Sequence, residues 1–80
     1  MSTQKSKKEL VAEMRKQLIE LDEFLTYGYV KQVKELLTYA VEDSTVHAVK
    51  SGQRNTITIL AAILNVAKEN RNAALKSIER

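Results

Sequence analysis

The residue types that most often carry out catalysis are scarce in this sequence. His47 is the only histidine and cysteine is absent, so the chain has neither a thiol nucleophile nor several imidazole or thiolate ligands for zinc. His47 falls beside the apolar stripe of a predicted helix, where a lone histidine more often packs than catalyses. We therefore expect no catalytic residue, no metal and no cofactor.

The acidic residues do not form an obvious catalytic or metal-binding group either. Asp22 adjoins Glu23, and Glu42 adjoins Asp43. Neighbouring residues point to different sides of a helix, so neither pair makes a general acid and base or an oxygen cage for a cation. No glycine-rich loop is present to hold a phosphate. The sequence predicts a protein that is not an enzyme.

The basic residues are concentrated in the last third of the chain. Residues 1–28 and 29–52 each balance their charges, so the net charge of +3 lies in residues 53–80. A basic end attracts phosphates, although cations near a helix C-terminus are also favourable without any ligand. Both interpretations stay open, and the candidate nucleic-acid contacts are Arg54, Lys68, Arg71, Asn72 and Lys76.

A weak helix-turn-helix pattern overlaps these basic residues. Ala61 would be the small residue of its first helix and Asn65 its turn, and the second helix would present Arg71 and Asn72 to DNA. Arg71 also stands where an apolar anchor is expected, and no glycine marks the turn. A continuous helix through the same residues is the simpler prediction.

Helices must position all of these side chains. Proline is absent, the chain has two glycines, and helix-forming residues dominate, which favours an all-α fold. We expect a single domain over residues 1–80, an up-down-up three-helix bundle with helices near 6–27, 29–51 and 55–79. Residues 1–5 are expected to be flexible.

Local signals set the helix ends. Ser6 with Glu9 three residues later predicts an N-terminal capping box. Gly28 and Gly52 are each expected to end a helix with a positive φ angle. Asp43-Ser44-Thr45 lowers helix propensity and leaves a break in the second helix as an alternative. A second alternative is a break near Asn70, which otherwise falls on the apolar stripe and could fix the register of a helical seam.

The third predicted helix is apolar on nearly every side between Ile57 and Ala67. Such a helix must be buried all round, and two neighbouring helices would leave part of it uncovered. We therefore expect oligomerisation, most simply a homodimer, to complete the bundle. The predicted protein interface consists of Leu36, Tyr39, Val46, Ile57, Leu60, Ile63 and Leu64.

These observations favour a small, non-catalytic, cytoplasmic protein that self-associates and regulates an unidentified protein partner. A small dimeric DNA-binding regulator is the alternative. No apolar run reaches the roughly 20 residues that span a bilayer, so membrane association is not expected.

Overall fold

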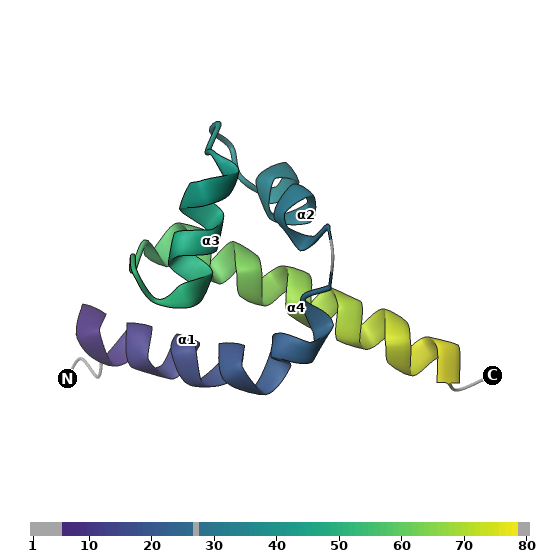
Figure 1. Ribbon diagram of the computed structural model, residues 1–80. Helices are drawn as coiled ribbons and strands as arrows, with labels where there is room; N and C mark the ends of the chain where they lie inside the picture. Colours follow the sequence, from purple (N-terminus) through teal and green to yellow (C-terminus); the bar gives the residue numbers. More distant parts are fainter. Residues whose placement is uncertain (1–5, 27, 79–80) are drawn as a thin grey trace.

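The computed structural model describes residues 6–26 and 28–78, which form four α-helices and one 3-10 turn and no strand (Figure 1). The all-α class is confirmed for this part of the chain. The elements are α1 (Lys7–Leu21), η1 (Asp22–Phe24), α2 (Tyr29–Leu36), α3 (Asp43–Ser51) and α4 (Ile57–Ile78). The prediction of a flexible segment at residues 1–5 lies outside the described residues.

The first helix begins where the sequence predicts and ends earlier. The Ser6 side chain caps it by accepting a hydrogen bond from the Glu9 backbone N–H at 3.2 Å. The α-helix stops at Leu21 and tightens into the turn η1. Asp22 and Glu23 place negative charge at this C-terminus, where the helix dipole disfavours it. The tighter turn leaves Phe24 packed against the core.

Both glycines adopt the left-handed conformation that was predicted for them. The φ angle is 95° at Gly28 and 97° at Gly52. Gly52 ends α3, and its N–H donates to the carbonyls of Ala48 and Val49. Gly28 instead stands directly before α2, after the chain has already left α1 and η1. Each glycine therefore reverses the chain, although only Gly52 ends an α-helix.

The single helix predicted for residues 29–51 is wrong, because the chain breaks into α2 and α3 at residues 37–42. The alternative of a break near Asp43-Ser44-Thr45 is closer to the structure, although these residues begin α3 and the break directly precedes them. Burial explains the break. Val33 and Val46 are both fully buried in the core, yet in one continuous helix residues 13 positions apart would face nearly opposite sides at about 100° per residue. Breaking the helix turns both valines toward α4.

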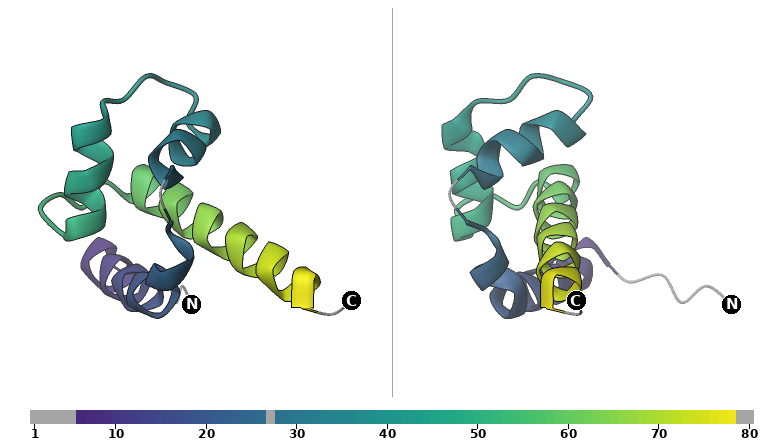
Figure 2. Two further views of the ribbon diagram at one scale, coloured as in Figure 1. Left: turned by 45° about the vertical axis from the view of Figure 1, so that its right-hand side comes forward. Right: turned by 90° about the vertical axis from the view of Figure 1, so that its right-hand side faces the viewer.

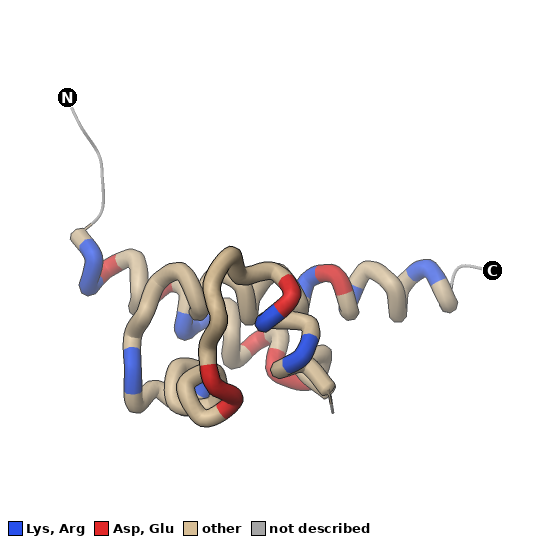
Figure 3. Tube along the Cα trace, turned by 90° about the horizontal axis from the view of Figure 1, so that it is seen from above, with Lys and Arg blue, Asp and Glu red and all other residues tan. Residues whose placement is uncertain are grey.

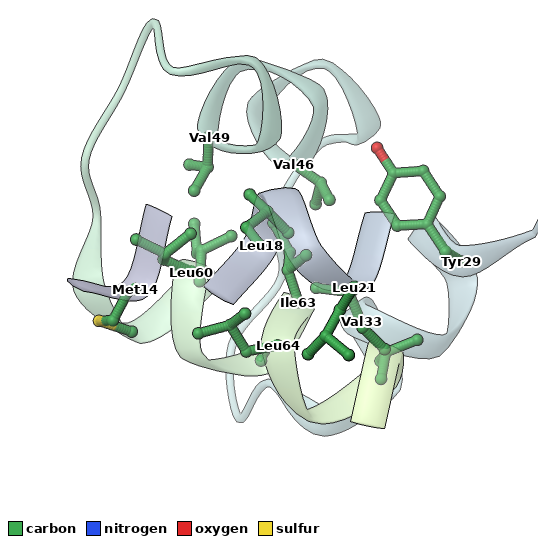
Figure 4. Packing of buried hydrophobic residues seen from close by; sticks show 14 residues of the cluster. Met14, Leu18, Leu21, Tyr29, Val33, Val46, Val49, Leu60, Ile63 and Leu64 are labelled. Carbon is green, nitrogen blue, oxygen red and sulfur yellow. The ribbon is translucent and has the colours of Figure 1, made fainter. Parts of the chain in front are cut away.

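The first half of α4 is the centre of the molecule. α1, η1, α2 and α3 all pack against it, and Figures 1 and 2 show them gathered around its first half. Figure 4 shows Leu60, Ile63 and Leu64 of α4 among Leu18, Leu21 and Val33. The buried residues of α4 are Ile59, Leu60, Ala62, Ile63, Leu64, Val66 and Ala67.

This packing overturns the reason for expecting a second chain around residues 57–67. The expectation assumed two covering helices, whereas the broken second helix supplies two separate covering elements in addition to α1. Leu60 and Ile63 are 0% exposed within one chain. A partner is therefore not required to bury this apolar run.

The second half of α4 extends beyond the other helices (Figures 1 and 2). Residues 71–77 are all exposed, and we call them the projecting segment. The Cα radius of gyration is 13.6 Å, against about 12 Å for a compact domain of 80 residues. α4 shows no break near Asn70, so the alternative of a broken third helix is wrong.

Candidate interaction surfaces

The seven residues predicted as a protein interface do not form one surface. Val46, Leu60, Ile63 and Leu64 belong to the buried core of the single chain, and Ile57 packs partly buried against it. Only two of the seven remain well exposed. Leu36 at the end of α2 is 46% exposed, and Tyr39 in the following loop is 47% exposed.

Four of the five predicted nucleic-acid contacts lie on one helix, whereas the predicted protein interface is dispersed. Lys68, Arg71, Asn72 and Lys76 are all exposed on the second half of α4. Arg54 lies apart from them, in the loop that joins α3 to the N-terminal end of α4. The helix-turn-helix prediction is wrong, because α4 runs without a turn through Asn65.

The spacing along α4 sorts these side chains into two rows. Lys68, Arg71 and Leu75 are separated by three and four positions and therefore share one side of the helix. Lys68, Asn72 and Lys76 follow one another at intervals of four and form the adjacent row. Leu75 is a large apolar side chain that is 50% exposed. The surface is thus mixed, with an apolar residue beside cations.

Asn70 holds the base of the projecting segment against the body. Its Nδ2 donates to the Phe24 carbonyl oxygen at 2.8 Å and lies 3.4 Å from Gln32 Oε1. The Gln32 Nε2 donates in return to Asn70 Oδ1 at 3.4 Å. Asn70 therefore joins α4 to η1 and α2 within one chain. This role accounts for a polar residue on the apolar stripe without a helical seam between two chains.

His47 belongs to a polar cluster on the surface between α2 and α3. The Tyr29 hydroxyl lies 3.0 Å from His47 Nδ1, and the two rings meet edge to face. Lys50 stands 5.8 Å from the centroid of the Tyr29 ring and forms a 2.9 Å ion pair with Asp22. These contacts link α3 to α2 and to η1. His47 acts here as a packing and hydrogen-bonding residue.

The chemistry of Tyr29 fits a structural hydrogen bond. Tyr29 is 8% exposed, and burial raises the pKa of its hydroxyl, with a smaller lowering by Lys50 and a further raising by Asp22. The phenol therefore keeps its proton at neutral pH. The sequence alone does not predict the burial of Tyr29, which becomes apparent only once α2 is separated from α3.

Arg15 makes the most extensive side-chain hydrogen bonds in the described part of the chain, and no local sequence pattern predicts them. Its guanidinium donates to the carbonyl oxygens of Val49 and Lys50 at the end of α3. It also donates to the Arg54 carbonyl oxygen at 2.6 Å and to Asn55 Oδ1 at 2.8 Å. Helix C-termini leave carbonyls without intrahelical partners. Arg15 satisfies these groups and fixes the loop that leads into α4.

A further exposed apolar residue lies near the end of α1. Ile19 is 79% exposed, the highest value among the exposed large hydrophobic side chains of the described residues. It borders a groove between α1 and α3 whose other lining residues include two cations and one carboxylate: Arg15, Leu18, Asp22, Lys50, Ser51 and Gly52. Glu20 and Glu23 are exposed close to Ile19 in the sequence. Sequence reasoning missed this surface because Ile19 lies just outside the apolar stripe of α1.

Two classes of feature are absent from residues 6–26 and 28–78. These residues contain no group of three or more acidic or histidine side chains that could hold a metal ion. None of their helices combines the length and the apolar character that a membrane crossing requires.

Comparison with known proteins adds no functional assignment. The chain matches no protein-family model, no curated protein and no solved structure. Its function is therefore inferred from its own surfaces.

Proposed function

We propose that this chain is a small, non-catalytic helical protein that self-associates through the projecting segment of α4 and in that form binds a protein partner. The observation that supports this proposal is the segment itself, a helix end whose residues 71–77 are all exposed. Leu75 is half exposed in its middle. Most helical stability in proteins comes from tertiary packing, and residues 71–77 are exposed within one chain, so packing against protein would stabilise this segment.

The side chains of the segment suit a helical contact. Ala73 and Ala74 are small and exposed, which lets another backbone approach closely. Leu75 supplies a large apolar side chain that gains free energy when it is removed from water, about 1.5–3 kcal/mol for complete burial. Leu36 at the end of α2 and Tyr39 in the loop that follows form a separate exposed apolar site. We assign that site to the protein partner.

The matched variants Leu75→Asp and Leu36→Asp separate the two sites. Both residues are about half exposed in the single chain, so both variants should keep the helical circular dichroism of the wild type. Sedimentation equilibrium should show self-association weakened at least about tenfold by Leu75→Asp, which corresponds to 1.4 kcal/mol. Leu36→Asp should associate as the wild type does.

Two results would contradict this assignment. If Leu75→Asp associates as strongly as the wild type, the projecting segment is not the contact. If Leu36→Asp dissociates the assembly instead, self-association uses the end of α2.

Nucleic-acid binding is a second candidate, supported by the exposure of Lys68, Arg71, Asn72 and Lys76 on one helix. A helix with its side chains is about 10–12 Å wide, and the major groove of B-DNA is about 12 Å wide. A helix that extends beyond its neighbours can enter such a groove. Arginine and asparagine hydrogen-bond to base edges, and lysine contacts phosphates.

Fluorescence anisotropy with a labelled DNA duplex tests this candidate. Binding should weaken steeply between about 50 and 200 mM salt, because counterions are released from the phosphates. Arg71→Ala combined with Lys76→Ala should weaken binding further, and Lys7→Ala combined with Lys8→Ala serves as a control at the far end of α1. Unchanged affinity in the first double variant would remove α4 as the contact.

A further inference from the structure

The loop between α2 and α3 reverses the chain without a residue that requires a reversal. Gly28 and Gly52 mark two other reversals with positive φ angles of 95° and 97°. Residues 37–42 contain neither glycine nor proline, and none of them has a positive φ angle. Leu37 and Glu42 are extended. The residue types of the loop therefore do not exclude a helical conformation.

The backbone of this loop has few partners in the single chain. Within residues 6–26 and 28–78, no N–H group of residues 38–42 donates to a backbone carbonyl. Thr38, Tyr39 and Ala40 are exposed, and Figure 2 shows the loop arching away from α4. In a continuous helix through residues 29–51, each of these N–H groups would donate to the carbonyl four residues before it. Straightening the loop would thus extend the hydrogen-bond ladder through it.

The apolar residues fit a continuous helix that is buried on two sides. Leu37 and Val41 follow Val33 at intervals of four positions, so they would extend the buried side of α2. Val46 stands 13 positions after Val33 and would face nearly the opposite side at about 100° per residue. One α4 cannot contact both sides of a straight helix, so the loop must bend within one chain. Two copies of α4 can contact both sides, one copy on each.

We propose that two copies of this chain exchange halves, with residues 37–42 straightened so that α2 and α3 form one helix. The segment from α1 to α2 of each copy then packs against α3 and α4 of the other. Each half of the dimer repeats contacts of the single chain, such as those of Arg15 with the end of α3 and of Asn70 with Phe24. Exchange of an identical element makes a dimer in this way without any new interface. This dimer is additional to the contact proposed for the projecting segment.

The two ends of the loop suit the crossing of two straightened helices. Lys34 Nζ lies 2.8 Å from Asp43 Oδ1, so the end of α2 is held beside the start of α3. In the exchanged dimer this ion pair joins two copies, because nine positions of one straight helix span about 13 Å. Residues 36–41 carry no charge, and Figure 3 shows this stretch between charged residues. The two helices therefore meet at the loop without opposed like charges.

Refolding from guanidinium chloride at high protein concentration should produce the exchanged dimer, and size exclusion with light scattering should separate it from the monomer. Its two halves must come apart before it can dissociate, so the isolated dimer should persist after dilution on the timescale of unfolding. In that dimer the amides of residues 38–42 should be protected from hydrogen exchange, whereas in the monomer they should exchange freely. A wild type that forms no slowly dissociating dimer would overturn the proposal.

Asp22 and Lys50 report which chain completes each half. They form a 2.9 Å ion pair between η1 and α3, on the two sides of the loop. The chain has no cysteine, so Asp22→Cys combined with Lys50→Cys introduces the only two thiols. A short bismaleimide crosslinker should join two chains in the dimer fraction and react within one chain in the monomer fraction, as seen on a denaturing gel. Crosslinks within one chain in the dimer fraction would show a surface contact and overturn the exchange.

Ala40→Gly and Ala12→Gly are a matched test of the straightened helix. Ala40 is exposed in the loop, and Ala12 is exposed in α1. Ala40→Gly should lower the association constant of the slow dimer at least about tenfold, because glycine disfavours a helix and each dimer contains two straightened loops. Ala12→Gly weakens α1 equally in both forms and should leave the ratio of dimer to monomer unchanged.

Ala40→Pro is the stronger variant, because proline in a helix interior removes a hydrogen bond and clashes with the preceding turn. It should abolish the slow dimer and leave a folded monomer with helical circular dichroism. A slow dimer of wild-type strength in either variant at position 40 would contradict the straightened loop.

The outcomes separate this inference from the proposed function. Leu75→Asp should remove the rapidly reversible association and leave the slow dimer, and Ala40→Pro should do the reverse. If no slow dimer forms, the exchange is overturned and association through the projecting segment stands. If the slow dimer forms while Leu75→Asp leaves the reversible association unchanged, the proposed function fails and the exchange stands.

Discussion

At the scale of single residues, Ile63 and Ile19 show how strongly position decides the role of one side-chain type. Ile63 is 0% exposed in the core, and Ile19 is 79% exposed on α1. Ile63→Asp should unfold the chain, because it removes a buried side chain worth about 2–5 kcal/mol and buries a charge without a partner. A domain of this size has a total stability of only about 4–12 kcal/mol.

Ile19→Asp is the matched control for the fold, since its side chain contacts mainly water. Thermal unfolding followed by circular dichroism at low protein concentration should show a cooperative transition for Ile19→Asp and none for Ile63→Asp. A folded Ile63→Asp monomer would contradict the assignment of this residue to the core.

Arg15 is the second residue whose substitution should be costly. Arg15→Met keeps the aliphatic stem but removes the Arg15 donor from the Val49 and Lys50 carbonyls at the end of α3. The Val49 carbonyl keeps the N–H of Gly52, whereas the Lys50 carbonyl loses its side-chain partner. We expect a loss of about 1–3 kcal/mol in the free energy of unfolding, measured with urea. Arg15→Lys should recover little of it, because an ammonium group cannot reproduce the planar fork of a guanidinium. The neighbouring exposed Lys16→Met should stay within about 0.5 kcal/mol of the wild type.

The ion pair between Lys34 and Asp43 gives a prediction about pH. The 2.8 Å contact from the Lys34 ammonium lowers the pKa of Asp43 below its ordinary value. A lowered carboxyl pKa contributes stability above the unfolded-state pKa of about 3.9, and that contribution is lost as pH falls through the folded-state value. NMR titration should show the Asp43 pKa rising toward its ordinary value in Lys34→Met. An unchanged Asp43 pKa in that variant would mean that the pair does not persist in solution.

At the scale of elements, the sequence predicts correctly that the elements are helices, but it predicts one helix boundary badly. Ser6 at the start of α1 and the positive φ of Gly28 and Gly52 are local properties, so they can be predicted from local signals. The break between α2 and α3 has no proline or glycine to mark it, and its one local signal is the low helix propensity of Asp43-Ser44-Thr45, which lie just after the break. It follows from the burial of both Val33 and Val46 against α4, which is a property of the tertiary structure.

Hydrogen exchange should divide α4 into two parts. The amides of residues 60–67 lie in the buried half of the helix, where opening requires unfolding of the core, so they should exchange slowly. The amides of residues 73–77 lie in the exposed half and should exchange orders of magnitude faster in dilute solution. At concentrations where the chain self-associates, the amides of residues 73–77 should become protected. Equal protection along the whole of α4 in a monomer would contradict the description of a projecting segment.

At the scale of the whole molecule, the candidate site could be predicted only in part. The basic residues of α4 were identified because charge composition does not depend on the fold. The apolar interface was misplaced, because an apolar run of residues shows that burial is needed without showing which element provides it. Leu60 and Ile63 find their cover within the chain. Ile19 and Leu75 find no such cover. The sequence alone does not distinguish them from the buried apolar residues, because that requires the positions of the helices.

The central claim is that this chain associates with itself although its core is complete in one copy. Its most direct test is the molar mass in solution, by size exclusion with light scattering over a wide range of concentrations at low salt. The account predicts a mass near the 9.1 kDa of one folded chain when dilute, rising toward twice that value as concentration increases. A mass of one chain at every concentration would contradict it.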